Sequence, residues 1–218
     1  MKWLTQALEG QSTAVVWRAQ PGLVAPLSYR RYANLAEVSA ASMAQGWPIR
    51  LRRSGGGVVP QGPGILNLSL AYPCQGAPGA MAESVYAHLC GVLSRALATL
   101  DIACGPGLVT DSFCDGRFNL AVPAQGKLRK IAGTAQYWRR TNGYQAVLAH
   151  ALLLVDADPE LLSAQANRFE AALASGLHYE AKTLTSVALC WSASHPGRAI
   201  PTDLSSTVAQ QIAASLSH

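Results

Sequence analysis

Residues 52–59 read Arg52-Arg53-Ser54-Gly55-Gly56-Gly57-Val58-Val59. They overlap a candidate strand, residues 49–53, in which apolar and basic side chains alternate. Three consecutive glycines lose much conformational entropy when they become ordered, so the chain must either turn here or let another group approach its backbone. Backbone N–H groups in such a loop commonly bind a phosphate or a carboxylate, and a flexible hairpin tip is the alternative. No Gly-Lys-Ser/Thr follows the glycines, so the loop is not a P-loop.

A second segment, further along the chain, is also rich in basic residues. It contains the run Arg129-Lys130-Ile131-Ala132-Gly133-Thr134-Ala135-Gln136. Residues 50–53 and 127–140 together hold eight of the seventeen Lys and Arg residues. If the two segments meet in the fold, they form an anion site suited to a nucleotide or an acyl phosphate. Otherwise these charges lie on solvated strand faces and turns.

The composition indicates one globular domain over residues 1–218. Half of the 218 residues are apolar, which is enough for a sizeable core. The net charge of +5 is too small to predict nucleic-acid binding unless the cations cluster on one face. The five cysteines show no paired spacing, which argues against a disulfide framework and against a zinc site.

The ends and the apolar runs give no sign of a membrane. The first residues lack a signal-peptide pattern, and the longest apolar run, residues 146–155, is about half the length of a membrane-spanning helix. We therefore expect a soluble protein with reduced thiols in the cytoplasm. We expect neither a metal site nor a nucleic-acid or membrane partner.

The periodicity of apolar residues predicts a mixture of helices and strands. Helices are expected over residues 32–45, 80–100 and 159–173, with a fourth near the C-terminus that Thr202 or Asp203 can cap. Strands are expected over residues 14–17, 49–53, 65–70, 118–122, 129–132, 136–140 and 144–155. The succession of strands in the second half favours an antiparallel-rich α+β domain over a doubly wound parallel one.

The two segments and a third, Asp115-Gly116-Arg117-Phe118-Asn119-Leu120-Ala121-Val122, resemble the lipoate-protein ligase A family of the biotin/lipoate ligase and octanoyltransferase superfamily. The resemblance covers residues 14–185, and two motifs in order at this spacing are more specific than either alone. It implies a fold like the core of class II aminoacyl-tRNA synthetases, with a mixed, largely antiparallel sheet and flanking helices.

The resemblance also implies a two-step reaction. ATP, which brings Mg²⁺, and lipoate or octanoate give an acyl-adenylate and pyrophosphate. A lysine of an acceptor domain then attacks the mixed anhydride; the acceptor is of the 2-oxoacid dehydrogenase E2 or glycine cleavage H protein type. Lys130 would be catalytic, bridging the acyl carbonyl and the phosphate. The residues expected to bind the substrate and the adenylate are Arg52, Arg53, Ser54, Gly55, Gly56, Gly57, Asn119, Gly133, Thr134 and Ala135.

The sequence departs from the family pattern in places that leave the activity open. Gln61 stands where one octanoyltransferase branch has a histidine. Octanoyltransferases use a cysteine that forms a thioester, and Cys114 lies close to the position used in one branch, although the count from the strand at Phe118 points nearer to Asp111. About thirty residues follow Thr185, too few for the family's accessory domain.

Several alternatives therefore remain beside the ligase. Adenylation would work without the accessory domain, or a separate partner would supply that domain, or the protein would only transfer acyl groups. The other functions are an octanoyltransferase that acts through Cys114 and a non-catalytic acyl-binding homologue, which the intact context of Lys130 argues against. His88 and His150 are expected to be core or boundary residues, and Asp158-Pro159 a helix start rather than part of a metal site.

Overall fold

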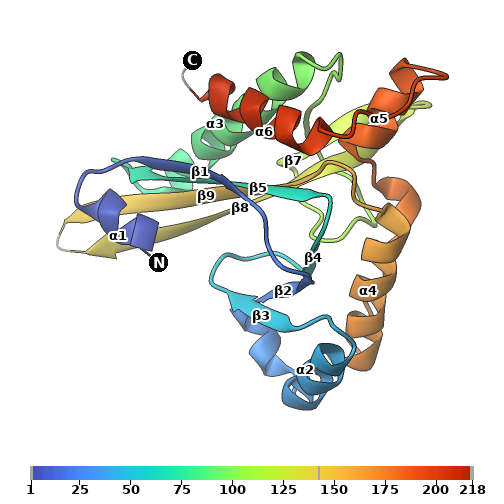
Figure 1. The fold of residues 1–218 in the computed structure, drawn as a ribbon. Coiled ribbons are helices and arrows are strands. Elements are labelled where there is room, and N and C mark those ends of the chain that lie inside the picture. The colour runs from blue at the N-terminus through green and yellow to red at the C-terminus, as the bar shows by residue number, and fades with distance from the viewer. Residues whose placement is uncertain (1, 142, 217–218) are drawn as a thin grey trace.

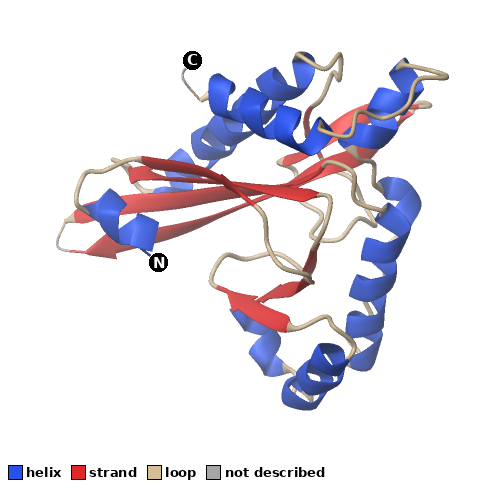
Figure 2. Ribbon diagram, viewed as in Figure 1, coloured by secondary structure: helices blue, strands red, loops and turns tan. Residues whose placement is uncertain are grey.

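The computed structural model describes residues 2–141 and 143–216. Its main element is a six-stranded sheet in the order β1-β5-β9-β8-β7-β6, and a three-stranded sheet, β3-β2-β4, lies beside it (Figures 1 and 2). Every neighbouring pair in the large sheet is antiparallel, whereas β2 and β3 are parallel. The strands are β1 (Thr13–Trp17), β2 (Gly22–Pro26), β3 (Ile49–Arg52), β4 (Val59–Gln61), β5 (Ile65–Pro73), β6 (Gly105–Gly107), β7 (Asn119–Ala124), β8 (Lys127–Thr141) and β9 (Tyr144–Leu154).

Helices lie over one face of the large sheet (Figure 1). The small sheet lies on the opposite side of the large sheet and has helices of its own beside it. The helices are α1 (Lys2–Leu8), α2 (Leu35–Ala44), α3 (Pro78–Ala98), α4 (Pro159–Ala172), α5 (Val187–Ser194) and α6 (Leu204–Ser215), with short 3₁₀ turns η1 (Leu27–Arg31) and η2 (Ala181–Thr183). This is the mixed α+β arrangement with a largely antiparallel sheet that the sequence predicts. None of the helices in the described part of the chain is long and apolar enough to cross a membrane.

Strand β9 separates two hydrophobic cores because its side chains alternate between the two faces of the sheet. Leu153 belongs to the core beneath α3 and α6, whereas Leu152 and Leu154 belong to the core shared with the small sheet and α4. A strand that is buried on both faces reads as a continuous apolar run. His150 shares its face with Leu152 and Leu154, so it is directed toward the small sheet.

The predicted elements are present, with three differences. The two strands expected over residues 129–132 and 136–140 are one continuous strand, β8, that runs through Gly133. Asp158 caps α4 by accepting a hydrogen bond from the Glu160 N–H group at 2.9 Å, whereas the Asp203 side chain accepts none from the backbone at the start of α6. Short elements that the periodicity did not reveal are α1, β2, β4, β6 and α5.

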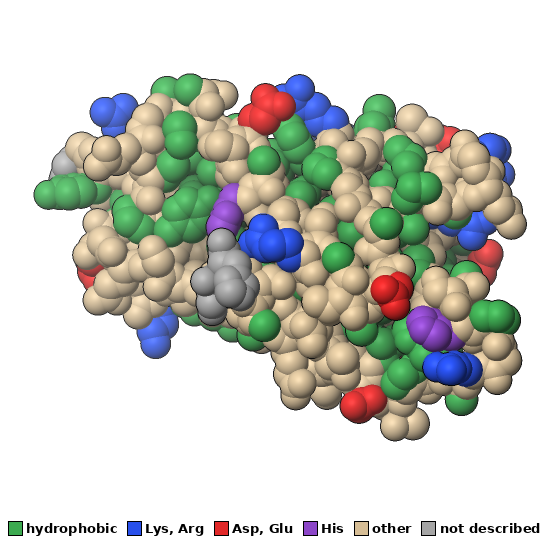
Figure 3. Space-filling view, turned by 90° about the horizontal axis from the view of Figure 1, so that it is seen from above, with side chains coloured by type: hydrophobic (Ala, Val, Ile, Leu, Met, Phe, Trp, Pro, Cys, Tyr) green, Lys and Arg blue, Asp and Glu red, His purple; other side chains and the backbone are tan. Residues whose placement is uncertain are grey.

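Figure 3 views the molecule from above, with the side of α3, α5 and α6 toward the reader. Among the described residues drawn on this face, the Lys and Arg side chains lie in several separate patches, some of them beside an acidic side chain.

Candidate active site

A cavity of about 410 Å³ lies between the small sheet and the large sheet. Five of its lining residues are predicted from the sequence to bind the substrate or to act as the alternative nucleophile: Arg52, Cys114, Gly133, Thr134 and Ala135. The remaining lining residues are Trp17, Ala19, Gln20, Val24, Arg50, Val59, Gln61, Asn67, Phe113, His150, Ala151 and Leu152. The walls are mainly apolar, so the cavity is suited to a hydrocarbon chain with a polar end.

Arg52 organises the glycine loop. Its guanidinium donates hydrogen bonds to the backbone carbonyls of Val24 at 2.7 Å, Gly55 at 2.9 Å and Gly57 at 2.7 Å. The same group lies 3.9 Å from the sulfur atom of Cys114. Arg52 thus fixes the conformation of the loop and places a positive charge beside a thiol. Its contact with a phosphate, expected from the sequence, stays a prediction. Arg53 is exposed and does not line the cavity.

Gly56 allows the glycine loop to approach this thiol. Its backbone has φ +99°, a conformation that L side chains rarely adopt, and a Cβ atom at this position would overlap the sulfur atom of Cys114. The neighbouring Ser54 is buried, and its hydroxyl lies 3.3 Å from Nε2 of His150. The triple glycine is therefore shaped around Cys114.

Replacing Gly56 with alanine should displace the loop from the sulfur. We expect Gly56→Ala to slow alkylation of Cys114 by iodoacetamide about tenfold or more and to lower the free energy of unfolding by about 1 kcal/mol or more. Mass spectrometry of the alkylated protein and urea unfolding measure the two effects. Gly55→Ala is the matched control, because a Cβ atom at Gly55 would meet no atom within 4 Å. Equal behaviour of the two variants would contradict this role for Gly56.

Cys114 lies on the loop between β6 and β7 in an unusual backbone conformation. Its φ is +52°, which is costly for a residue with a side chain and persists only where surrounding contacts hold it. Those contacts are hydrogen bonds to its carbonyl oxygen, from Nζ of Lys130 at 3.1 Å and from the Asn119 side-chain amide at 3.3 Å. The sulfur is thereby held at the cavity wall.

Lys130 lies behind Cys114 and does not itself line the cavity. Its side chain is 1% exposed, and Nζ also donates to the Phe113 carbonyl oxygen at 2.5 Å. Burial lowers the pKa of Lys130 to about 8. A Cβ atom at Gly133 would lie 3.2 Å from both Cε and Nζ of Lys130, so this glycine leaves space for the lysine. The contact of Lys130 with a phosphate, expected from the sequence, stays a prediction.

Two polar side chains of the cavity wall are hydrogen-bonded to each other. The side-chain amides of Gln61 and Asn67 exchange hydrogen bonds of 2.9 and 3.0 Å. Gln61 therefore has a defined structural partner at the position where a related branch has histidine. The Thr134 hydroxyl donates to the Phe118 carbonyl oxygen at 2.7 Å.

The two histidines of interest have different environments. His150 lies at the cavity wall beside Ser54 rather than inside the core, whereas His88 lies exposed on α3. His88 is thus neither a core nor a boundary residue, because its position falls on the solvent side of the amphipathic helix.

The burial of His150 makes stability depend on pH. Burial, with a smaller contribution from Arg52, lowers the pKa of His150 from 6.5 to about 4. As the pH falls below 6.5, the unfolded chain binds a proton that the folded chain does not bind until about pH 4, so the free energy of unfolding decreases through this window. From pH 7.5 to pH 5 the unmodified protein should lose about 2 kcal/mol more than the His150→Gln variant. Urea unfolding at both pH values measures this, and equal losses would exclude His150 as the cause.

A buried carboxylate with two tyrosine partners, which the sequence does not reveal, lies beneath the glycine loop. Glu170 is completely buried, and its Oε1 atom accepts hydrogen bonds from the hydroxyl groups of Tyr29 at 2.5 Å and Tyr179 at 2.9 Å. Burial raises the pKa of both tyrosines. The Tyr179 hydroxyl also lies 3.4 Å from the place that a Cβ atom of Gly57 would take. These residues come from three distant parts of the chain, so no local motif signals them.

Comparison with known proteins places this site in a family. Residues 1–187 match the family described as the lipoyl protein ligase A/B catalytic domain. An uncharacterized protein of Cupriavidus necator is 49% identical over 208 residues, which are 92% of this chain and 81% of that protein. An octanoyl-[GcvH]:protein N-octanoyltransferase of Kyrpidia tusciae is 42% identical over 132 residues. Those residues are 57% of this chain but only 43% of that relative.

Solved structures share the fold at lower sequence identity. A lipoate-protein ligase A bound with ATP aligns with a TM-score of 0.63 and 17% identity, over 99% of this chain and 78% of that one. A putative lipoate protein ligase from T. acidophilum with bound lipoic acid gives a TM-score of 0.63 and 17% identity, over 100% of this chain and 81% of that one. The predicted fold is thereby confirmed.

Proposed function

The chain belongs to the lipoyl protein ligase A/B catalytic domain family, and we propose that it transfers octanoyl groups between proteins through a thioester on Cys114. The observation that carries the proposal is the placement of Cys114. Its sulfur borders the cavity with Arg52 at 3.9 Å, and its strained backbone is held by two side-chain donors. The thiolate form of a cysteine is the nucleophile in acyl transfer, and the position of this sulfur at the cavity wall leaves it open to an acyl group.

The reaction would proceed in two displacements. The Cys114 thiolate forms a bond to the acyl carbonyl carbon, the bond from that carbon to the donor's nitrogen or sulfur atom breaks, and the departing group takes up a proton. The ε-amine of an acceptor lysine then attacks the thioester carbonyl. An amide forms, Cys114 leaves as a thiolate, and the amine gives its proton to solvent. Lys130 and Asn119 would keep the nucleophile in place in both steps.

The acyl chain and the partners follow from the cavity and the relatives. Val24, Val59, Phe113 and Leu152 give the cavity apolar walls that an eight-carbon chain can occupy. The relative from K. tusciae is named for octanoyl transfer from GcvH to protein. We therefore propose acceptors of the 2-oxoacid dehydrogenase E2 or glycine cleavage H protein type, and one catalytic domain over residues 1–218.

An ATP-dependent lipoate ligase is the second candidate, because the Lys130 motif and the glycine loop of that family are both present. The residues fit a nucleotide poorly in their present arrangement. Arg52 donates to three carbonyl groups, and Nζ of Lys130 donates to two. A ligase would need these donors released for the phosphates. Within the described part of the chain, no group of three His, Cys, Asp or Glu residues could hold a metal ion, so Mg²⁺ would have to enter with ATP.

A donor assay distinguishes the two candidates. The protein is incubated with a lysine-bearing acceptor domain and either an octanoylated donor protein without ATP, or free octanoate or lipoate with ATP and Mg²⁺. We expect the acceptor to gain one octanoyl mass in the first mixture only. Acylation in the second mixture, with release of pyrophosphate and none in the first, would replace the transferase by the ligase. No acylation in either mixture would leave only the non-catalytic homologue.

A further inference from the structure

We propose that a second hollow, the basic groove, docks the acceptor domain through acidic residues beside its target lysine. This inference rests on the proposed acyl transfer. The basic groove has a volume of about 670 Å³ and is formed by three segments, residues 108–111, 124–129 and 182–183. Its lining residues are Leu108, Val109, Thr110, Asp111, Ala124, Gln125, Lys127, Leu128, Arg129, Lys182 and Thr183.

The groove combines positive charge with exposed apolar surface. Three cations, Lys127, Arg129 and Lys182, line the groove together with one carboxylate residue, Asp111, and Lys182 forms an ion pair of 3.2 Å with Glu180, which is not itself a lining residue. Among the described residues, neither Lys127 nor Arg129 forms a salt bridge. Leu108 and Leu128 are 54% and 45% exposed. Cations around exposed leucines fit a protein surface with acidic and apolar side chains, and they steer such a partner during encounter.

The loop before Cys114 and strand β8 each contribute residues both to the basic groove and to the 410 Å³ cavity lined by Cys114 (the catalytic cavity), although no single residue lines both. Residues 108–111 line the groove, and the same loop continues to Phe113 and Cys114, which line the cavity. Strand β8 connects the two sites in the same way, because Lys127 and Arg129 line the groove and the next residue, Lys130, holds the Cys114 carbonyl. A domain bound in the groove would therefore present its lysine a few residues from the proposed thioester.

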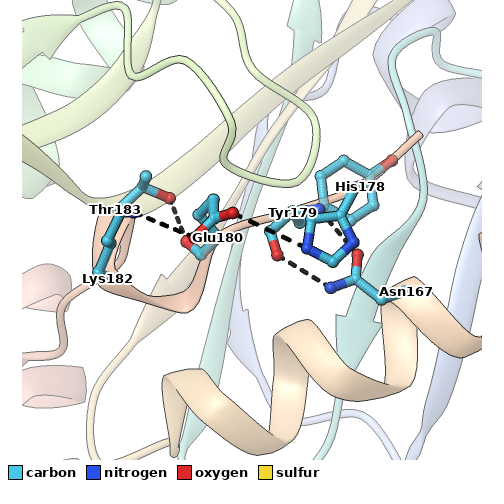
Figure 4. Close-up of polar contacts among 6 residues, drawn as sticks. All are labelled: Asn167, His178, Tyr179, Glu180, Lys182 and Thr183. Carbon is cyan, nitrogen blue, oxygen red and sulfur yellow. Dashed lines mark hydrogen bonds and ion pairs between the residues drawn. The ribbon is translucent and has the colours of Figure 1, made fainter.

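The chain segment that contributes Lys182 and Thr183 to the groove is fixed by hydrogen bonds and an ion pair (Figure 4). The side-chain amide of Asn167 pairs with both the N–H group and the carbonyl of Tyr179, at 2.8 and 2.9 Å. Thr183 donates to the Glu180 carbonyl oxygen at 2.6 Å, and Nζ of Lys182 lies 3.2 Å from the Glu180 carboxylate. The Glu180 N–H group donates to the carbonyl of Asp111 at 2.8 Å, which ties this segment to the loop of Cys114.

This arrangement favours a protein over a nucleic acid as the occupant. A nucleic-acid backbone has no apolar group to place against the exposed side chains of Leu108 and Leu128. An acidic protein domain can place an apolar residue against the leucines and carboxylates against Lys127 and Arg129. It can also bring the nucleophilic lysine toward the loop that carries Cys114.

The test measures binding and chemistry separately. Binding of an unmodified lipoyl-type acceptor domain is titrated calorimetrically against the whole protein, its Lys127→Glu/Lys182→Glu variant and its Leu128→Ser variant. We expect the charge variant to weaken binding about tenfold, more at low salt than at high salt, and Leu128→Ser to weaken it severalfold. Arg198→Glu is the matched control, because Arg198 is exposed and lies outside the groove lining. Replacing acidic residues next to the acceptor lysine with lysine should restore binding to the charge variant.

Formation of the Cys114 thioester from a small octanoyl thioester is followed by intact mass in the same proteins. It should be unchanged in the groove variants, since none of these residues lines the catalytic cavity. Loss of acceptor binding with normal thioester formation supports the groove. Unchanged acceptor binding in the groove variants would contradict docking in the groove. Weaker binding of the octanoylated donor protein, with acceptor binding unchanged, would contradict it as well. Absence of any thioester in the unmodified protein refutes the proposed function, while the binding titration still decides the groove.

Discussion

Replacing Cys114 with serine should reduce octanoyl transfer by at least about a thousandfold, because a serine hydroxyl cannot replace the thiolate as attacking and leaving group. The fold should be retained, since serine is nearly the size of cysteine and the anchors from Lys130 and Asn119 act on the backbone carbonyl. The measurements are the initial rate of acceptor acylation and the intact mass of the protein after incubation with the donor. The acyl adduct should disappear together with the activity.

Cys104→Ser is the control for this experiment. Cys104 is also partly buried, but its thiol lies beside the Ser94 hydroxyl and does not line the cavity. Its replacement should leave transfer and the adduct unchanged. If Cys114→Ser still transfers octanoyl groups at a normal rate, the cysteine mechanism is wrong and the ATP-dependent candidate gains support.

Replacing Lys130 with methionine should reduce transfer about a hundredfold while changing stability little. The carbonyl groups of Phe113 and Cys114 lose their buried donor, so the strained loop that presents the sulfur is no longer held. Removing the lysine also removes the cost of burying an ammonium group, which offsets part of the lost hydrogen bonding. In this variant the transfer activity should therefore fall while the free energy of unfolding changes little. Replacement of a purely structural lysine would lower both together.

The pH dependence of the free energy of unfolding tests whether burial of the Lys130 ammonium group is costly. The pKa of Lys130 is lowered from 10.5 to about 8, so its burial penalty is fully present below pH 8 and is relieved as the pH rises toward 10.5. Between pH 7 and pH 9, the unmodified protein should gain about 1 kcal/mol relative to Lys130→Met. Urea unfolding at the two pH values measures the difference. Lys2→Met, on α1, is the control and should show no such gain.

Two motifs carry the prediction of the site from the sequence. The glycine loop and the segment from Lys130 to Ala135 lie in one region of the fold, and Gly133 is packed against Lys130. What the motifs do not specify is the direction of a side chain. The N–H groups of Arg52 donate to the carbonyls of Val24 on β2 and of Gly55 and Gly57 in the glycine loop, and its contact with a phosphate stays a prediction.

Other features depend on contacts between distant segments and have no local signal. His150 is part of an apolar strand, and only the arrangement of the two sheets places it at the cavity wall. Counting residues from the strand at Phe118 points nearer to Asp111 than to Cys114, because a count does not register the turn made by the loop. In the structure Asp111 lines the basic groove and Cys114 lines the cavity between the two sheets, and the role of Cys114 as nucleophile stays a prediction.

The buried contacts of Glu170 have a consequence for how the molecule forms during synthesis. Tyr29 emerges from the ribosome 141 positions before its carboxylate partner, and Tyr179 emerges 9 positions after it. The glycine loop rests on this cluster, so more than three quarters of the chain is translated before the carboxylate beneath the loop is present. Contacts of such sequence separation close late and slow the folding of a domain. A ribosome-bound chain that stops before α4 would thus lack both the Glu170 carboxylate and the Tyr179 hydroxyl that lie beneath its glycine loop.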